Sequence, residues 1–330
     1  MGKSNTMTDD THESGSPNVA PLRRFAHEAM ACTFEAALVC DDARYAGQVA
    51  RAVFDEIDRL ERELSRFVPT SDVARLNALR PGESLQLGAD ALECLRLAEQ
   101  MCRETGGAFD VTYASRVKPT RDQSNRCTTT ASQDHANANA ASPLLEIDPE
   151  HHCARVHAVG VHVDLGGIGK GFALDRALDV LREWGISAAL IHAGQSSVFA
   201  FGTPVNNKSN PSATWRIALR DPLEPARIRG RVRLADAALS GSGRKLHGDH
   251  IIDPRTGQAA TAKIAAWAAA PSAAVADALS TAFMVMPPAA IESYCRQNPT
   301  VAALIAREEA GTVNYVRWGA NPWELEPQTE

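Results

Sequence analysis

The sequence lacks a long apolar run at its start and lacks an excess of basic charge. The opening stretch, MGKSNTMTDDTHESGSPNVAP, is polar and has no apolar segment of the kind that forms a signal peptide or a membrane anchor. We therefore expect a cytoplasmic protein without a transmembrane segment. The net charge of -6 at pH 7 argues against nucleic acid as the main partner, because neutralising phosphates requires a basic surface.

Paired cysteines are also missing. The seven cysteines are odd in number, scattered, and contain no CxxC pair. A zinc site or a disulfide framework would need tighter spacing, so the pattern favours free thiols in a reducing compartment. These residues are Cys32, Cys40, Cys94, Cys102, Cys127, Cys153 and Cys295.

The remaining composition is typical of a globular protein. The chain has 330 residues, of which 44% are hydrophobic and 22% charged, so it can bury a sizeable core. We predict a disordered leader over residues 1–22 and a single domain over 23–330. Within that domain, residues 115–142 have almost no large apolar side chains. They cannot bury enough surface to offset the entropy of ordering, so we predict a mobile insertion there.

Apolar periodicity predicts helices and strands in an irregular order. Apolar residues at steps of three and four predict helices over 45–64, 89–104, 172–184, 272–286 and 289–297. Alternating or short apolar runs predict strands within 25–40, 144–148, 154–159, 161–165, 188–202, 215–222 and 230–236. Because the elements follow no regular βαβ rhythm, the pattern favours an α+β fold over a doubly wound Rossmann sheet.

A glycine-rich turn stands out in residues 163–175, VDLGGIGKGFALD. A strand, a glycine turn and a helix start together suit a phosphate, because backbone N–H groups and the positive helix end attract an anion. The dinucleotide fingerprint fails because Phe172 stands in place of its third glycine. The Walker A loop fails because Gly171 follows Lys170 where Ser or Thr is needed. A tight strand-to-helix connection without a ligand remains the alternative.

A carboxylate and a hydroxyl lie one helical turn apart in the segment ADALSTAFMV. Asp277 and Thr281 share one face of the predicted helix, and that pair suits a hard cation such as Mg²⁺. The alternative is that Asp277 only caps the helix or complements its dipole. The apolar flanks indicate a buried helix, in which an unpaired carboxylate is costly, so Asp277 needs a partner.

Two further segments carry polar side chains that could act in chemistry. In HGDHIIDPRTG, His247 and His250 are three residues apart, but no third zinc ligand is near in sequence. A histidine that carries a proton, or that only bonds the turn, fits better. In TGGAFDVT, Asp110 follows an aromatic residue on a predicted short strand. It either caps its own turn or accepts hydrogen bonds from a ribose or base.

Taken together, these motifs resemble those of the FAD:protein FMN transferases, the ApbE family. The resemblance spans about residues 25–305 and omits the insertion at 115–142. It is carried, in family order, by AMACTFEA, LSRFVPTSDVARLN, TGGAFDVT, VDLGGIGKGFALD, SGSGRKLHGDHIIDPRTG and ADALSTA. The resemblance implies mixed, largely antiparallel sheets with packed helices.

The resemblance also implies a reaction and its metal site. Members of the family split FAD, attach FMN through a phosphoester to a threonine of a target protein, and release AMP, with Mg²⁺ as cofactor. Carried over by position, the metal would be held by Asp277 and Thr281, with Ser280 beside them and the carbonyl of Gly169 opposite. The partners implied are FAD and a protein that offers a modifiable threonine.

The residues expected to contact FAD follow from the same resemblance. They are Met30, Phe67, Ala108, Phe109, Asp110, Gly166, Lys170, Phe172, His250 and Ile251. Lys170 and the amides of the glycine turn would stabilise the leaving AMP, and His250 or Asp253 would act as the base for the threonine hydroxyl.

Two departures from the family leave other functions open. The segment HAGQSS differs from the two-glycine pattern of many relatives, and many relatives are exported lipoproteins, whereas no lipobox cysteine is visible here. An FAD pyrophosphatase that gives FMN and AMP, and a non-catalytic FAD-binding protein, remain the alternatives. Retention of Asp277, Thr281 and Lys170 argues against a pure binder.

Overall fold

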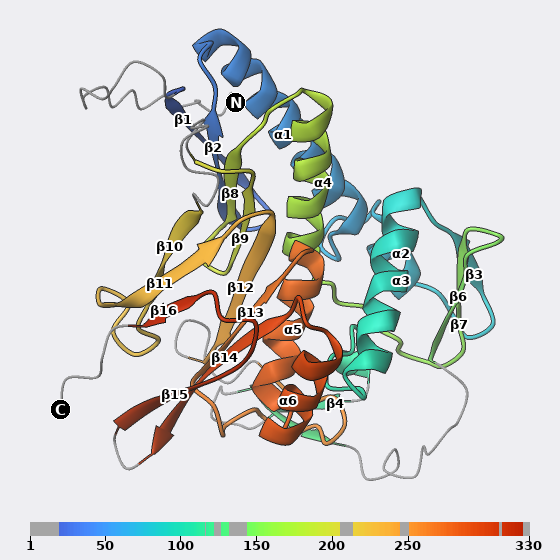
Figure 1. Ribbon diagram of the computed structural model, residues 1–330. Helices are drawn as coiled ribbons and strands as arrows, with labels where there is room; N and C mark the ends of the chain where they lie inside the picture. The colour runs from blue at the N-terminus through green and yellow to red at the C-terminus, as the bar shows by residue number, and fades with distance from the viewer. Residues whose placement is uncertain are drawn as a thin grey trace.

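The fold is built on one long antiparallel sheet. The structure, a computed structural model, describes residues 20–115, 117–121, 127–131, 144–204, 214–244, 251–309 and 312–325. Within these residues an eight-stranded sheet has the order β1-β2-β8-β9-β12-β13-β14-β15 (Figure 1). Its strands are β1 (Leu22–Ala29), β2 (Cys32–Val39), β8 (Ala189–Ala193), β9 (Ser197–Phe201), β12 (Ala237–Gly243), β13 (Ala265–Ala270), β14 (Ala302–Glu309) and β15 (Thr312–Gly319).

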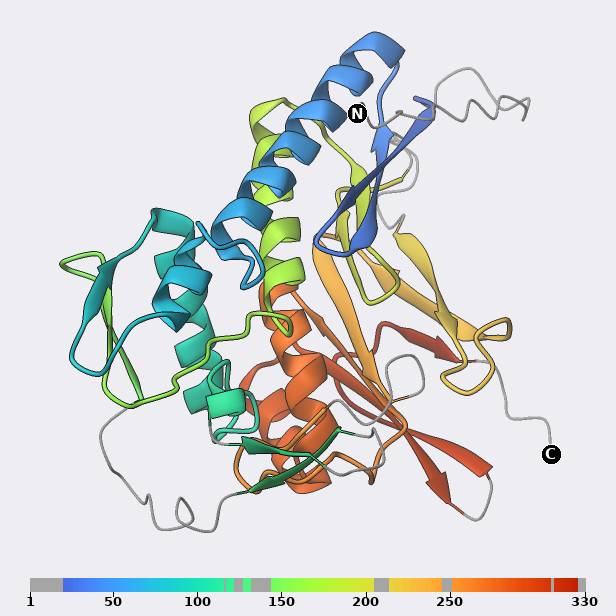
Figure 2. The ribbon, with the colours of Figure 1, turned by 180° about the vertical axis from the view of Figure 1, so that it is seen from behind.

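Helices cover one face of this sheet, and a small second sheet covers part of the other. These helices are α1 (Ala43–Leu64), α4 (Gly169–Glu183), α5 (Ala273–Val285) and α6 (Pro288–Gln297), and α3 (Ala89–Glu104) packs against α1 and α5 (Figure 2). The second sheet is formed by β10 (Trp215–Arg220), β11 (Ile228–Leu234) and β16 (Trp323–Leu325). Along β14, Ala303 and Ile305 enter the core under the helices, whereas Ala302 and Leu304 enter the core under the second sheet. The long sheet is therefore buried on both faces at β14.

A smaller group of elements packs beside α3. It contains α2 (Asp72–Asn77) and a three-stranded sheet of β3 (Ser84–Gln86), β7 (Cys153–Val156) and β6 (Leu145–Asp148). A 3-10 turn, η1 (Tyr113–Ser115), leads to the hairpin of β4 (Val117–Arg121) and β5 (Cys127–Ala131). In the parts of the chain that the structure describes, no helix is both long enough and apolar enough to cross a bilayer.

The predicted fold class is confirmed. Every strand pair within the described ranges is antiparallel, and no Rossmann arrangement is present among them. The helix predicted over 89–104 has those bounds, and the one predicted over 45–64 begins two residues earlier because Asp42 accepts hydrogen bonds from the amides of Arg44 and Tyr45. The leader up to residue 19, and most of the predicted insertion at 115–142, lie outside the described residues. The mobility of the insertion and the single-domain organisation stay predictions.

Two predicted strands are wrong. Residues 161–165 are extended but pair with no strand in the described structure, because side chains take the place of a neighbouring strand: Asn77 bonds both the N–H and the C=O of Val163, at 2.6 and 2.9 Å. The short strand expected at Ala108–Asp110 is a turn, since Gly106 and Gly107 leave α3 with positive φ angles of 60° and 77°. Helix α4 also begins at Gly169 rather than near Phe172, so the glycine motif supplies its first turn.

The strands that sequence reasoning missed are rich in small residues. Strand β12 reads AALSGSG and β13 reads AAWAAA, and neither has the β-branched residues typical of strands. Both pack directly under α5, which is itself rich in alanine. Small side chains on all three elements allow their backbones to lie close together.

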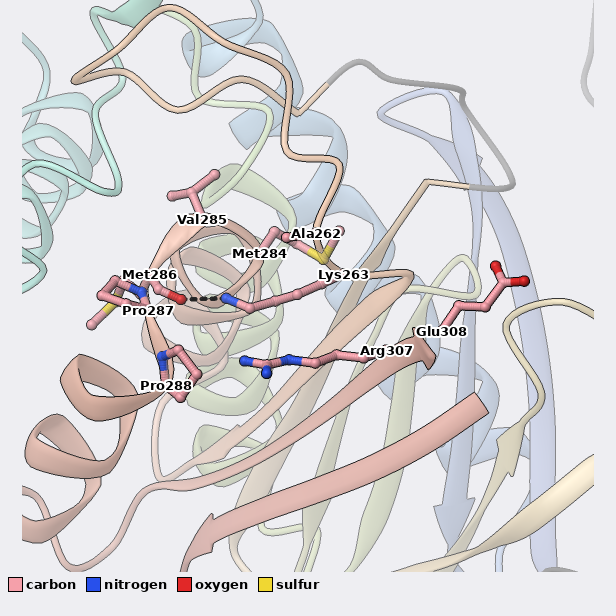
Figure 3. A pocket seen from close by; sticks show the side chains of 9 residues that line it. All are labelled: Ala262, Lys263, Met284, Val285, Met286, Pro287, Pro288, Arg307 and Glu308. Carbon is pink, nitrogen blue, oxygen red and sulfur yellow. Dashed lines mark hydrogen bonds between the residues drawn. The ribbon is translucent and has the colours of Figure 1, made fainter. Parts of the chain in front are cut away.

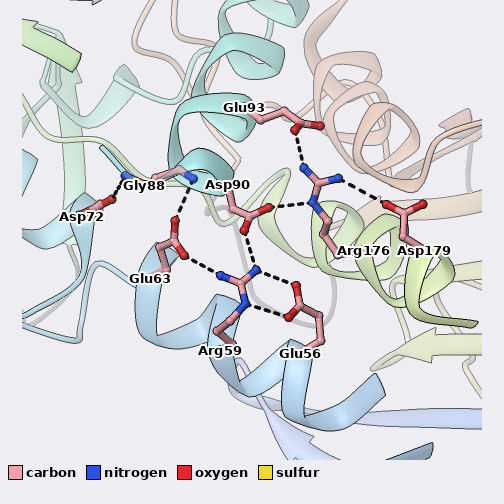
Figure 4. A network of polar contacts seen from close by, with 10 residues as sticks. Glu56, Arg59, Glu63, Asp72, Gly88, Asp90, Glu93, Arg176 and Asp179 are labelled. Carbon is pink, nitrogen blue, oxygen red and sulfur yellow. Dashed lines mark hydrogen bonds and ion pairs between the residues drawn. The ribbon is translucent and has the colours of Figure 1, made fainter. Parts of the chain in front are cut away.

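A polar network ties three helices to one another. Asp90 of α3 accepts hydrogen bonds from Arg59 of α1 and from Arg176 of α4, the latter with an Nε to Oδ1 distance of 2.8 Å (Figure 4). Arg176 also binds Glu93, and its guanidinium lies 4.8 Å from the ring centre of Phe172. The network therefore fixes the orientation of α4 against α1 and α3.

The start of α4 packs against the start of α5 with no room for a side chain between them. A Cβ atom placed on Gly171 would lie 2.2 Å from the carbonyl oxygen of Ala273, and backbone atoms cannot yield as a flexible side chain can.

We predict that Gly171→Ala lowers the free energy of unfolding by about 3 kcal/mol, because the added methyl group must push α4 away from α5. Urea denaturation would measure the change. The control is Gly47→Ala in α1, where the added atom meets only an ordinary van der Waals contact with Phe25 at 3.9 Å and helix propensity should raise stability by about 0.5–1 kcal/mol. Equal effects of the two substitutions would contradict the close approach.

Candidate functional site

Asp277 lies at the point where α4 meets α5. Its side chain is on the buried face of α5, and the residue is 4% exposed. Among the described residues, its Oδ2 accepts a hydrogen bond from the Gly171 amide at 3.2 Å and its Oδ1 accepts one from Ser197 Oγ at 3.4 Å. The carboxylate thus faces the first turn of α4, where unpaired N–H groups give the helix a partial positive charge.

Hydroxyl groups surround this carboxylate. Within α5, Ser280 and Thr281 each donate to the carbonyl of Asp277, at 2.9 and 3.4 Å. Ser242 of β12 lies within hydrogen-bond distance of both hydroxyls, at 2.9 and 3.3 Å. On the other side, Ser240 donates to Ser197 at 2.9 Å. We call Asp277, Ser280, Thr281, Ser197, Ser240 and Ser242 the hydroxyl cluster.

The glycine motif lies against the hydroxyl cluster and an aromatic ring. A Cβ atom on Gly167 would lie 3.2 Å from both Thr281 Oγ1 and a ring carbon of Phe109, so this position favours glycine. Helix α4 has no side-chain cap at Ile168. The Gly169 amide donates to the carbonyl of Leu165 at 2.7 Å and the Gly171 amide donates to Asp277, so the helix start offers an anion mainly its partial positive charge. Lys170 in this turn is partly exposed, and its Nζ donates to the carbonyl of Gly166 at 3.2 Å.

The loop after α1 brings the predicted residue Phe67 toward the glycine motif. Arg66 lies 3.6 Å from Asp164, whose carboxylate accepts the Gly166 amide at 2.9 Å. The adjacent Phe67 is 79% exposed, with the Arg66 guanidinium 4.6 Å from its ring centre. An aromatic ring left this open on a loop beside the glycine motif is available to a ligand.

The hairpin turn between β1 and β2 lies against the turn that joins β8 to β9. Its two residues, Met30 and Ala31, both have positive φ angles, of 49° and 58°. The next residue, Cys32, contacts the turn at Gly194 that joins β8 to β9. Burial raises the pKa of the Cys32 thiol, and the positive charge of Lys170 acts against that rise. Met30 thus lies two residues before a cysteine whose pKa the charge of Lys170 affects.

The loop DPRTG is held by an internal ion pair. Asp253 accepts hydrogen bonds from Arg255 Nε at 2.8 Å and Nη2 at 2.7 Å, and also from the Arg255 backbone amide. The Arg255 side chain lies against Gly107, so this loop contacts the TGGAFD turn. Ile251, at the start of the loop, is buried in the main core. His247 and His250 lie outside the described residues.

The structure thus places most of the predicted site residues around the junction of α4 and α5. The contacts of Asp110 fit the alternative role of capping its own turn. Its Oδ1 accepts hydrogen bonds from the amide and the hydroxyl of Thr112, both at 2.7 Å. Phe172 is 3% exposed, and its ring packs against the guanidinium of Arg176. It therefore belongs to the core beneath the site and does not line the surface of the site.

The donor set suits a hard cation. No group of three His, Cys, Asp or Glu side chains within the described ranges could hold a metal, so any metal here would rely on one carboxylate with hydroxyl and carbonyl oxygens. Asp277 is buried with only neutral groups as hydrogen-bond partners in the described part of the chain. A buried charge in such surroundings needs a counter-charge, and oxygen ligands are those that Mg²⁺ prefers.

Sequence reasoning missed Asp175, which joins the two helices. Its carboxylate accepts hydrogen bonds from Ser272 Oγ at 2.7 Å and from the amides of Ala273 and Ala274 at 2.7 and 2.9 Å. It therefore caps the helix that carries Asp277 from the helix that carries Lys170. Burial raises the pKa of Asp175. The signal was present in the sequence, because Asp175 falls on the apolar face of α4 between Phe172 and Leu178.

We predict that Asp175→Ala lowers the free energy of unfolding by about 2–3 kcal/mol, because it removes three hydrogen bonds at the start of α5. Asp179→Ala, one turn later on α4, is the control. Asp179 is exposed and has only 3.4 Å contacts to Arg176 and Arg182, so its loss should change stability by less than about 0.5 kcal/mol. Chemical denaturation of both variants measures the two changes. Similar losses in the free energy of unfolding would show that the hydrogen bonds of Asp175 do not hold α5 to α4.

Comparisons with known proteins place the chain in a family. The model of the ApbE family matches residues 30–305. The chain is 26% identical to the FAD:protein FMN transferase of Klebsiella pneumoniae (78% of this chain, 76% of that protein) and 27% identical to that of Treponema pallidum (80% of each).

Solved structures share the fold. The apo form of the flavinyl transferase ApbE of Pseudomonas stutzeri superposes with a TM-score of 0.76 at 23% identity, covering 92% of this chain and 96% of that one. The flavin transferase ApbE of Vibrio cholerae gives a TM-score of 0.73 at 20% identity, covering 91% and 97%. The fold and the motif order point to the same family.

Proposed function

This chain belongs to the ApbE family, and we propose that it acts as an FAD:protein FMN transferase. It would move FMN from FAD to a threonine hydroxyl of a target protein and release AMP, with Mg²⁺ as cofactor. The observation that carries the proposal is the junction of α4 and α5. There a buried carboxylate, several hydroxyls and the amide-rich start of a helix lie together. Such a junction suits a cation and a diphosphate side by side.

The metal would be held by Asp277, Thr281 and Ser280, together with the carbonyl of Gly169. Bound Mg²⁺ would withdraw charge from the diphosphate of FAD and stabilise the leaving phosphate. The fit rests on the burial of Asp277, whose hydrogen-bond partners in the described part of the chain are neutral, and on the hydroxyl groups of Ser280 and Thr281 in the next turn.

The chain's own residues would bind and orient the substrates. Lys170 and the positive end of α4 would hold the diphosphate, since a cation and a helix N-terminus both attract an anion. Phe67 and Phe109 would offer faces for the rings of FAD, and Met30 would contribute from the hairpin turn between β1 and β2.

A base is needed to accept the proton of the threonine hydroxyl. Of the two candidates, Asp253 has both oxygens engaged by the guanidinium of Arg255. That pairing suits a residue that holds the DPRTG loop in place rather than one that takes up a proton. We therefore propose His250 as the base, with Asp253 as a residue that holds the DPRTG loop in place.

One experiment distinguishes the transferase from its alternatives. The purified protein is incubated with FAD, Mg²⁺ and a candidate flavin-accepting domain, and AMP is followed together with the mass of the acceptor. AMP with an FMN adduct on threonine supports the transferase. AMP in the absence of an adduct, across several acceptors, would indicate a pyrophosphatase, and tight FAD binding without either product a carrier.

We predict that Asp277→Asn reduces AMP release by about a hundredfold or more, because it removes the only carboxylate proposed for the metal. Asp179→Asn is the matched control and should retain full activity, since its side chain is exposed on α4. A titration with Mg²⁺ should show that Asp277→Asn needs far higher concentrations of the ion. Normal activity of Asp277→Asn would remove the metal assignment.

We also predict that His250→Ala lowers kcat by about 10²–10⁴-fold while leaving FAD affinity nearly unchanged, as expected for loss of a general base. Asp253→Asn should act mainly by loosening the loop and should be partly compensated at high FAD concentration. Steady-state kinetics with fluorescence titration of FAD would measure both effects. If Asp253→Asn had the larger loss of kcat, the two roles would be exchanged.

A further inference from the structure

A second pocket lies at the far end of α5 from the start of α4. It has a volume of about 410 Å³ and is lined by Lys263, the segment from Met284 to Pro288, and Arg307 (Figure 3). None of these residues belongs to the proposed flavin site. Asp277 and Thr281 lie earlier in the same helix, so one helix separates the two sites.

Arg307 occupies a position in β14 that would otherwise be apolar. Ala303 and Ile305 point from the same face of the strand into the core beneath the helices, and Arg307 follows two residues later. Its Nε is buried and has no hydrogen-bond partner among the described residues. A buried guanidinium donor without an acceptor is unfavourable, so the position calls for an acceptor that comes from outside the fold.

Lys263 provides a second cation in the same pocket. It is 4% exposed, and its Nζ donates to the carbonyls of Phe283 and Met286 at the end of α5. Burial, followed by repulsion from Arg307 and Arg255, lowers the pKa of Lys263 to about 8. An anion placed between Lys263 and Arg307 would relieve that repulsion.

The remaining walls decide what kind of anion fits. Met286, Pro287 and Pro288 present apolar surface beside the two cations, and Figure 3 shows the Arg307 side chain extending toward Pro288. The one carboxylate in the lining, Glu308, points away from both cations in the same view. Apolar walls favour an anion on a hydrocarbon stem over a bare inorganic ion, and a planar carboxylate matches the fork of an arginine.

We propose that this pocket binds a carboxylate carried on a short aliphatic stem, with Arg307 as its main ligand and Lys263 as the second. The carboxylate belongs either to a free small acid or to a glutamate side chain of a bound peptide. Both sources share the same chemistry, and the site lies apart from the flavin site in either case.

The test is calorimetric titration of the full chain with glutarate, with the tripeptide N-acetyl-Ala-Glu-Ala-amide, and with inorganic phosphate. We expect glutarate to bind, and Arg307→Gln to weaken its binding at least about tenfold. Arg296→Gln on α6 is the control, because that exposed arginine pairs only with Glu292 on its own helix among the described residues and should leave binding unchanged. Thermal unfolding of each variant verifies that it is folded, and Arg307→Lys serves as a milder variant that keeps the charge.

The choice of ligands distinguishes a free small acid from a glutamate side chain of a peptide. Binding of both glutarate and the tripeptide supports a site that accepts a peptide side chain, whereas binding of glutarate alone supports a free acid. The proposal is overturned if no carboxylate binds up to about 20 mM, if Arg307→Gln binds as well as the unaltered chain, or if phosphate binds more tightly than glutarate. None of these measurements depends on flavin transfer, so they succeed or fail independently of the proposed function.

Discussion

The close approach of two helix starts is the constraint on which the site depends. Because Gly171 has no side chain, the backbone of α4 reaches the first turn of α5, and Asp175 fastens the two together. This contact sets the positive end of α4 opposite the carboxylate of Asp277. A buried carboxylate is normally unfavourable in an alanine-rich helix, and the approach of α4 makes it tolerable. Stability and site geometry therefore have one origin.

The same constraint explains the composition of the central strands. Strands β12 and β13 use alanine, serine and glycine because larger side chains would hold α5 away from the sheet. Ser240 and Ser242 are two residues apart and so point to the same face of β12, toward Ser197 and the hydroxyls of α5. The hydroxyl cluster is thus a product of close packing. Its polar groups satisfy one another where water has little access.

The sequence predicted the helices with apolar periodicity and missed several strands, among them β12, β13 and β14. Helices α1 and α3 have strong periodicity, and their prediction is confirmed. Strand β14 faces apolar cores on both sides and so shows no alternation. Residues 161–165 look like a strand but bond to the side chain of Asn77, a contact that no local pattern reveals. In the site, Asp277 and Thr281 were visible as a helical pair, whereas Ser197, Ser240 and Ser242 depended on strand register. The FAD contacts stay predictions.

The hairpin at Met30 and Ala31 has a wider implication for how this chain balances stability against function. Turns with two positive φ angles favour asparagine and glycine, yet this turn has Met30 and Ala31 at those positions. The most stable sequence for the turn is therefore not the one present. A chain optimised for folding alone would favour asparagine or glycine at Met30, whereas here the backbone accepts two positive φ angles and keeps a flexible thioether at the tip of the hairpin.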